Sequence, residues 1–173
     1  MRGAINRDSP HLIAPAVLSG PDHSKLNRDC PYLLRFAGYA SVFDRVDRGG
    51  DVVRAGAFAA SLRARRAVPL LWQHRPGAVI GAIETLAEDA RGLRVVARVT
   101  HPTAAALVAR GALRGLSFGY RVTASRGKGP RELLALDLAE VSLVAMPMQR
   151  LARVIAVDVG GECEVVSPSP SFA

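Results

Sequence analysis

The sequence has few cysteines, few aromatic residues, almost no lysine and no long apolar run. Its two cysteines, Cys30 and Cys163, lie near opposite ends of the 173 residues, without the close pairing typical of a zinc site. No apolar segment approaches the roughly 20 residues that span a bilayer. Asp8, Pro10 and Pro15 interrupt the stretch where a secretion signal needs continuous apolar residues. These absences predict a soluble protein that is not exported, has no membrane partner and uses neither a metal nor another cofactor.

Lysine is nearly absent from a strongly basic chain. The net charge is +8, and 21 of the 23 basic residues are arginine. Such a charge first suggests a nucleic-acid partner. However, the arginines are scattered, with Arg63, Arg65 and Arg66 as the tightest cluster, and aromatic residues, on which bases stack, make up only 5% of the chain. A specific nucleic-acid partner is therefore not expected, although an arginine-rich nucleic-acid-binding module stays among the alternatives.

The composition predicts one folded domain between two arms. The length and the 49% hydrophobic content suit a single core. Residues 1–31 are rich in Pro, Asp, Asn and Ser, and residues 159–173 are rich in Gly, Ser and Pro. We therefore expect flexible arms at both ends and a domain at residues 32–158.

Short strands dominate the pattern inside this domain. Residues 93–99, LRVVARV, show the period-two alternation of a strand with one buried face. Further strands are expected at residues 33–42, 69–74, 78–86, 116–123, 131–138, 140–145 and 152–157, and helices only at residues 55–66 and 102–113. This pattern predicts a mostly-β fold with flanking helices, of the α+β class: a β-barrel or a strongly curved sheet.

An apolar run, VPLLWQH, ends in His74. A histidine that closes a strand is more often structural than catalytic. An imidazole at that position could nevertheless leave the apolar body and reach a neighbouring strand. His74 is therefore a candidate for a catalytic or metal-binding role, with a structural role as the alternative.

A glycine-flanked serine follows the second expected helix, in the segment GLSFGY. Ser117 alternates with Leu116 and Phe118, so its side chain should point away from the apolar face of the strand. Gly115 and Gly119 lie two residues to either side, and glycine in a strand often marks a close approach by a backbone or a ligand. Ser117 is therefore a candidate nucleophile that is expected to be exposed. The alternative is an ordinary polar residue in a glycine-rich strand.

Two carboxylates interrupt the apolar segment LALDLAEVSLVAMP. A carboxylate in such a strand is costly unless it is paired. By alternation, Glu140 should share a face with Leu136 and Leu138, while Asp137 lies on the other face with Val141. Either carboxylate could orient His74, and a structural pairing with arginine is the alternative for both.

Four segments together resemble a known family. They are GYASVFDRVDRGGDVVRAGAF (residues 38–58), LLWQH (70–74), GLSFGY (115–120) and LAEVSLVAMP (138–147). In this order they are similar to the prohead proteases of HK97-type tailed phages and of gene-transfer particles, a family related to the herpesvirus assemblins. The resemblance covers roughly residues 34–157. The chain departs from the family pattern at Arg75 and at Met148-Gln149-Arg150.

The resemblance implies a serine endopeptidase with a herpesvirus-protease-like β-barrel. By motif, Ser117 would be the nucleophile, His74 the general base and Glu140 the acidic third member. The implied substrate is the scaffolding segment of the major capsid protein or a scaffolding protein, and the protease itself, inside the procapsid assembling in a bacterial cytoplasm. Self-association is compatible with this interpretation. The alternative from another class is a non-catalytic capsid or tail structural protein built on the same barrel.

Overall fold

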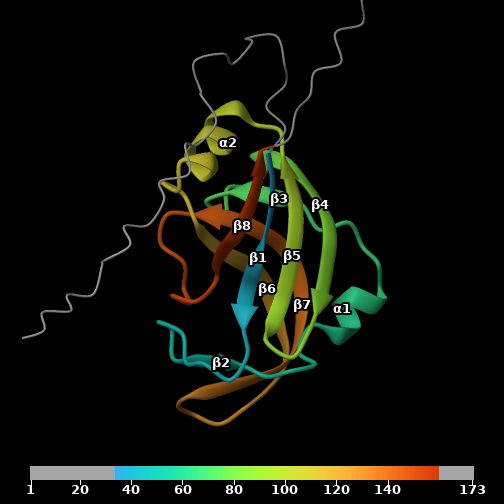
Figure 1. Cartoon of the computed structure of the whole chain (residues 1–173). Helices are drawn as coiled ribbons and strands as arrows, with labels where there is room; N and C mark the ends of the chain where they lie inside the picture. The colour runs from blue at the N-terminus through green and yellow to red at the C-terminus, as the bar shows by residue number, and fades with distance from the viewer. Residues whose placement is uncertain (1–33, 160–173) are drawn as a thin grey trace, which may run out of the picture.

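The computed structural model describes residues 34–159, which contain eight strands and two helices (Figure 1). In chain order these are β1 Leu34–Val42, β2 Asp51–Val53, α1 Ala59–Arg63, β3 Leu70–Trp72, β4 Val79–Glu88, β5 Gly92–Val99, α2 Pro102–Ala109, β6 Gly115–Arg126, β7 Arg131–Val144 and β8 Arg153–Val159.

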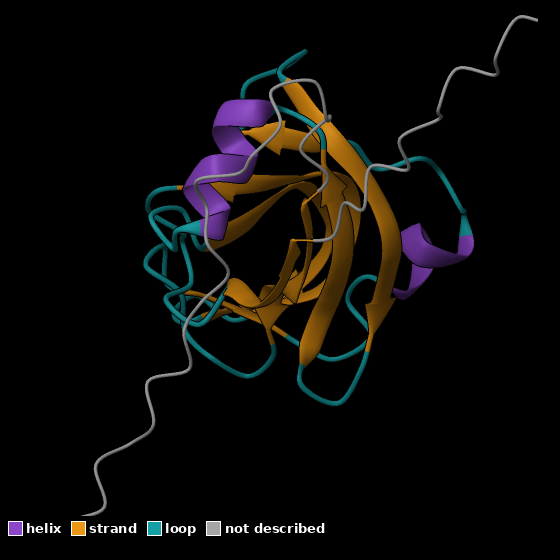
Figure 2. Cartoon of the chain, turned by 45° about the horizontal axis from the view of Figure 1, so that its top comes forward, coloured by secondary structure: helices purple, strands orange, loops and turns teal. Residues whose placement is uncertain are grey.

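The strands form one sheet that closes on itself. Its order is β2-β7-β3-β4-β5-β1-β8-β6, and β6 also pairs with β7, so seven strands make a barrel from which β2 branches. In Figure 2 the strands form a ring, and both helices lie outside it. The expected mostly-β barrel with flanking helices is confirmed.

Strand β7 pairs with more strands than any other described strand does. It pairs antiparallel with β6 over almost its full length, and parallel with β2 and with β3. In the parallel register Trp72 lies beside Leu143. The segment that follows β3 is thereby brought next to the C-terminal half of β7.

The barrel interior is filled by aliphatic and aromatic side chains from most of the strands. Alternation in β5 largely holds, because Leu93, Val95 and Val99 are buried while Arg94 and Arg98 are exposed. Val96, on the side of the two arginines, is buried as well. The largest fully buried side chains are Phe36, Phe58, Leu34, Leu70, Leu93, Leu116, Leu133, Leu136 and Leu143.

Several boundaries differ from those expected. The segments at 131–138 and 140–145 are one strand, β7, which register shifts against β6 break into differently facing parts. Strand β2 was not expected, because its three residues are too few to show the period-two alternation of a strand. Both helices are shorter than expected, and left-handed residues lie beyond their ends: Arg65 has φ +49° after α1, and Gly111 has φ +73° after α2.

The expected arms, residues 1–31 and 159–173, lie outside the described residues except for Val159, and so does Cys30. Between residues 34 and 159, no helix is long and apolar enough to cross a membrane.

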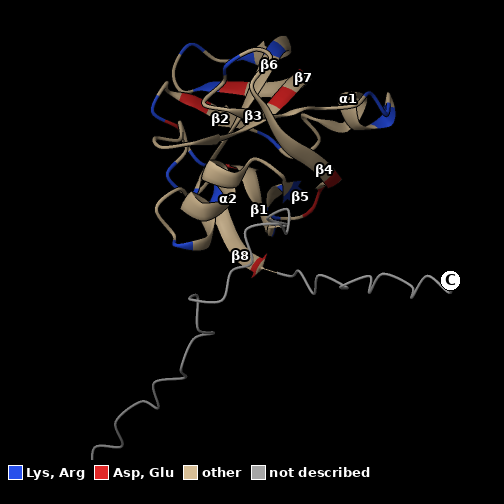
Figure 3. Cartoon of the chain, turned by 90° about the horizontal axis from the view of Figure 1, so that it is seen from above, with Lys and Arg blue, Asp and Glu red and all other residues tan. Residues whose placement is uncertain are grey.

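Many arginines are engaged in ion pairs within the fold. Figure 3 shows basic residues spread over loops, α1 and several strands. The arginines that pair with carboxylates in the described chain are Arg35, Arg54, Arg66, Arg98, Arg126 and Arg131. Part of the basic charge is therefore used in ion pairs between elements of the barrel.

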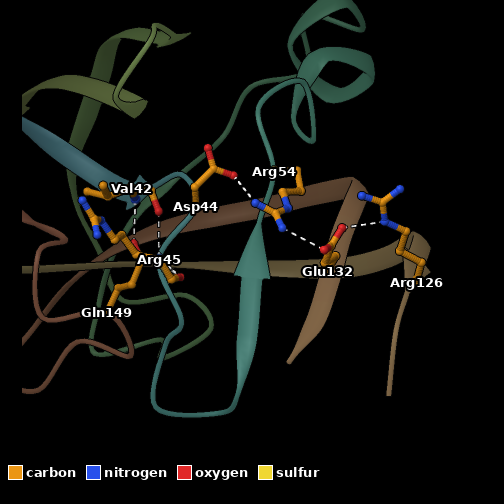
Figure 4. A network of polar contacts seen from close by, with 7 residues as sticks. All are labelled: Val42, Asp44, Arg45, Arg54, Arg126, Glu132 and Gln149. Atoms are coloured by element: carbon orange, nitrogen blue, oxygen red, sulfur yellow. Dashed lines mark hydrogen bonds and ion pairs between the residues drawn. The ribbon is translucent and has the colours of Figure 1, made fainter. Parts of the chain in front are cut away.

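A buried glutamine fixes the loop between β7 and β8 to the end of β1 (Figure 4). Gln149 Oε1 accepts from the Val42 N–H at 2.6 Å, and Gln149 Nε2 donates to the Val42 carbonyl at 2.8 Å and to the Arg45 carbonyl at 3.2 Å. The side-chain amide thus replaces a strand partner for Val42. This position is one of those where the sequence departs from the family pattern, and the structure gives it an internal role.

A second network ties β2 to the β6–β7 hairpin (Figure 4). The Arg54 guanidinium donates to Glu132 at 2.7 Å and to Asp44 at 2.6 Å, and Arg126 donates to the other oxygen of Glu132 at 2.5 Å. The hydrogen bond from Arg54, which has the larger effect, and the one from Arg126 lower the pKa of Glu132 from 4.5 to about 2.

This low pKa predicts a pH-dependent contribution of Glu132 to stability. Because the pKa is lower in the folded than in the unfolded protein, the stabilisation is complete above pH 4.5 and is lost as the pH falls towards about 2. Glu132→Gln should therefore lower the melting temperature at neutral pH, by an amount that shrinks on acidification. Thermal melting across this range tests it, with Arg126→Gln expected to reproduce part of the loss. A difference between parent and Glu132→Gln that does not change with pH would contradict the pairing.

Candidate active site

His74 lies in the tight turn that follows β3 rather than at the end of the strand itself. Gln73 and His74 both have left-handed backbones, with φ +51° and φ +58°. Non-glycine residues adopt this conformation only where their surroundings hold it. Here the Gln73 N–H donates to the Leu143 carbonyl at 3.0 Å, and the His74 N–H donates to Ser142 Oγ at 3.1 Å. Strand β7 therefore sets the geometry of this turn.

The imidazole of His74 contacts the carboxylate of Glu140. His74 Nδ1 lies 2.6 Å from Glu140 Oε1, and the side chain of His74 is 43% exposed while that of Glu140 is 12% exposed. The second carboxylate oxygen, Oε2, accepts from the Ser142 hydroxyl at 2.6 Å. Of the two candidate carboxylates, Glu140 is thus the one that meets His74.

Glu140 reaches His74 because β7 contains a bulge. Gly119 lies opposite Glu140, whereas the next residue of β6, Tyr120, lies opposite Leu138, so Ala139 is the extra residue. Leu138 and Val141 both face the core, and Glu140 points away from it. The expectation that Glu140 shares a face with Leu136 and Leu138 is wrong, since it assumed unbroken alternation.

Ser117 lies directly opposite Ser142 in the antiparallel β6–β7 ladder. Opposite residues of a ladder project from the same face of a sheet, so Ser117, Gly119, Glu140 and Ser142 share one face, away from the core side of Leu116. This face agrees with the orientation expected for Ser117. Among the described residues, the Ser117 hydroxyl forms no hydrogen bond, in contrast to that of Ser142.

The expectation that Ser117 is exposed is wrong, because the residue retains only 5% of its accessible surface. Two features of the surroundings account for this. Ser142 lies directly opposite it on the neighbouring strand, and the loop after β7 approaches the same face of β6 at Gly115, where a Cβ would lie 2.9 Å from Pro147 Cδ.

Gly119 is the glycine that the site requires. A Cβ at this position would lie 2.5 Å from Glu140 Oε1 and 3.0 Å from Glu140 Cγ. A side chain on Gly119 would therefore displace the carboxylate that contacts His74. The glycine-flanked serine suggested a close approach, and here the approaching group is the Glu140 carboxylate.

Asp137 and one further polar residue, His101, have structural partners. Asp137 forms an ion pair with Arg66, whose Nη2 lies 2.6 Å from Asp137 Oδ1, as expected for an arginine-paired carboxylate. His101 caps α2 by accepting from the Ala104 N–H, although at a long 3.4 Å. Within residues 34–159 no group of three or more His, Cys, Asp or Glu side chains is placed to hold a metal ion.

Two participants were not identified from the sequence. Ser142 lies inside the quoted segment LAEVSLVAMP, but no pattern marks it as a partner of both His74 and Glu140. The bulge at Ala139 was not predicted either, because the alternation in LALDLAE does not indicate an extra residue.

Comparison with known proteins places this geometry in a family. The caudovirus prohead serine protease family matches residues 27–162, which include every residue of the site. The chain belongs to this family. The resemblance found in the four sequence segments is thereby confirmed.

A phage protein related to this chain agrees with the assignment. The prohead protease of Enterobacteria phage HK97 is 38% identical over 94 residues, a match that covers 50% of this chain and 42% of the HK97 protein. The aligned part thus spans less than half of that relative.

A solved viral protease shows the same fold, and a second has a slightly lower TM-score. The varicella-zoster virus protease has a TM-score of 0.51 at 14% identity, over 74% of this chain and 65% of that one. The KSHV protease in complex with a hexapeptide phosphonate inhibitor has a TM-score of 0.49 at 16% identity, over 73% and 65%. The likeness to the varicella-zoster virus protease shows that the barrel is of the kind found in herpesvirus proteases.

Proposed function

We propose that this protein is a serine endopeptidase that cleaves the scaffolding segment of the major capsid protein, or a scaffolding protein, inside the procapsid, and that it also cleaves itself. Membership of the prohead serine protease family supports the reaction class. The observation that carries the proposal is the 2.6 Å contact of His74 with Glu140, on the sheet face that also holds Ser117.

In this proposal Glu140 fixes the tautomer of His74. An ionised carboxylate can only accept a hydrogen bond, so the imidazole must donate from Nδ1. The lone pair of Nε2 is then free to take the proton of the Ser117 hydroxyl as its oxygen attacks the scissile carbonyl. His74 later returns that proton to the leaving amine, and Glu140 stabilises the imidazolium in between.

The opposing hypothesis is a non-catalytic capsid or tail structural protein on the same barrel. The 5% exposure of Ser117 favours it, because a nucleophile must meet its substrate. Against it, a purely structural barrel has no need of a left-handed His74 turn or of a glycine that makes room for Glu140. The two hypotheses differ in what removal of the Ser117 hydroxyl does.

Co-expression with its capsid protein should yield a shortened capsid chain, and Ser117→Ala should leave that chain at full length. Loss of a serine nucleophile lowers turnover by roughly 10⁶-fold in a comparable protease, which abolishes visible processing. Ser125→Ala, an exposed serine on the same strand, is the matched control and should process like the parent. Equal processing by Ser117→Ala and parent, with equal melting temperatures, would remove Ser117 from the mechanism.

The two carboxylates of β7 should differ sharply in their effect on turnover. Glu140→Gln replaces the carboxylate with a neutral amide that can donate to His74 Nδ1 and favour the wrong tautomer, so it should lower kcat by up to roughly 10⁴-fold, as when the orienting acid of a serine protease becomes an amide. Asp137→Asn breaks only an exposed pair with Arg66 and should stay within about threefold of the parent. Single-turnover cleavage of a capsid-derived peptide, with melting as the folding control, measures both. If Asp137→Asn lost most of its turnover while Glu140→Gln kept nearly the parent rate, Asp137 and not Glu140 would be the acidic residue that orients His74.

A further inference from the structure

The hydroxyl of Ser142 occupies the only hydrogen-bonded link between the His74 backbone and the Glu140 carboxylate in the described chain. Its oxygen accepts from the His74 N–H at 3.1 Å, and its proton is donated to Glu140 Oε2 at 2.6 Å. Ser142 has no exposed surface. The direction of both hydrogen bonds is fixed, because an N–H can only donate and an ionised carboxylate can only accept.

This geometry separates Ser142 from Ser117. The single proton of Ser142 is directed at Glu140, so the imidazole of His74 cannot take it, and no substrate can reach a fully buried oxygen. Ser142 is therefore not a second nucleophile. The hydroxyl is placed where it acts on both members of the His74–Glu140 pair at once.

The pairing of β3 with β7 shows what the hydroxyl replaces. Up to Gln73, whose N–H donates to the Leu143 carbonyl, the chain after β3 bonds to the backbone of β7. At His74 the left-handed turn has begun, and the next N–H bonds to the Ser142 side chain instead. The Ser142 hydroxyl thus holds the strained residue that carries the imidazole, while it orients the carboxylate that the imidazole meets.

From these contacts we infer that Ser142 is a positioning residue of the protease, which sets the His74–Glu140 geometry through one hydroxyl shared by the His74 N–H and Glu140 Oε2. This inference rests on the proposed function for its effect on catalysis. Without the hydroxyl, the carboxylate can rotate and the turn loses a hydrogen bond, so the imidazole is misplaced relative to Ser117. A misplacement of about 1 Å costs roughly 10²-fold in rate.

Removal of the hydroxyl should therefore lower kcat by roughly 10- to 100-fold and change KM by less than about twofold, since Ser142 cannot touch substrate. Ser142→Ala and the nearly isosteric Ser142→Cys, whose thiol is a weak hydrogen-bonding group, are the variants to compare on a capsid-derived peptide. Ser41→Ala is the matched control: Ser41 is also fully buried, and its hydroxyl has no partner in the described chain. It should leave kcat unchanged.

A double-mutant cycle distinguishes positioning from a general structural effect. If Ser142 acts through Glu140, Ser142→Ala should cost less than about twofold in a Glu140→Gln background. The imidazole proton held between His74 Nδ1 and Glu140 provides a readout without substrate. Its proton NMR signal, assigned by its loss in His74→Gln, should shift or broaden in Ser142→Ala and stay in place in Ser41→Ala.

Three outcomes would overturn the inference: kcat within twofold of the parent in folded Ser142→Ala and Ser142→Cys, full additivity with Glu140→Gln, or failure of both Ser142 variants to fold, which would make the residue structural only. Failure of the proposed function looks different. In that case the parent and Ser117→Ala would both be inactive or equally active, while the NMR signal would still report whether Ser142 holds His74 against Glu140.

Discussion

The pairing of β7 with both β3 and β6 is the constraint on which the barrel and its site depend. The antiparallel β6–β7 ladder closes the ring of strands and places Ser117 opposite Ser142. The short parallel ladder with β3 brings the following turn, and with it His74, against the same part of β7. One strand therefore carries Glu140 and positions the two side chains with which we propose it acts.

The bulge at Ala139 makes this arrangement compatible with a packed core. Without the extra residue, strict alternation would place Glu140 on the side of Leu138, in the barrel interior, where an unpaired carboxylate is costly. With it, Val141 and Leu143 continue the core while Glu140 turns to the outer face. Bulges are common beside active sites, and this one reverses the alternation of β7 after Leu138, so that Glu140 and Ser142 lie on the outer face.

Much of the fold could be predicted from the sequence, because most strands follow period-two alternation. LRVVARV became β5 with the expected faces except at Val96, which is buried on the side of Arg94 and Arg98. Prediction failed at the bulge, where the extra residue Ala139 reversed the face of Glu140. It also failed at β2, because three residues are too few to show a pattern. The position of Glu140 against His74 followed from motif resemblance, whereas the roles of Gly119 and Ser142 needed the three-dimensional pairing. The burial of Ser117, which retains 5% of its accessible surface, was not revealed by any local pattern.

We propose that His74, oriented by Glu140, activates Ser117 and no other serine. Diisopropyl fluorophosphate tests it directly, because an activated serine oxygen displaces fluoride from phosphorus and stays covalently modified. Mass spectrometry of the digested protein should find the adduct on Ser117 in the parent, and none in His74→Ala at the same reagent concentration. An adduct on Ser142, or one on Ser117 that forms equally fast without His74, would show that the chemistry at this site is different.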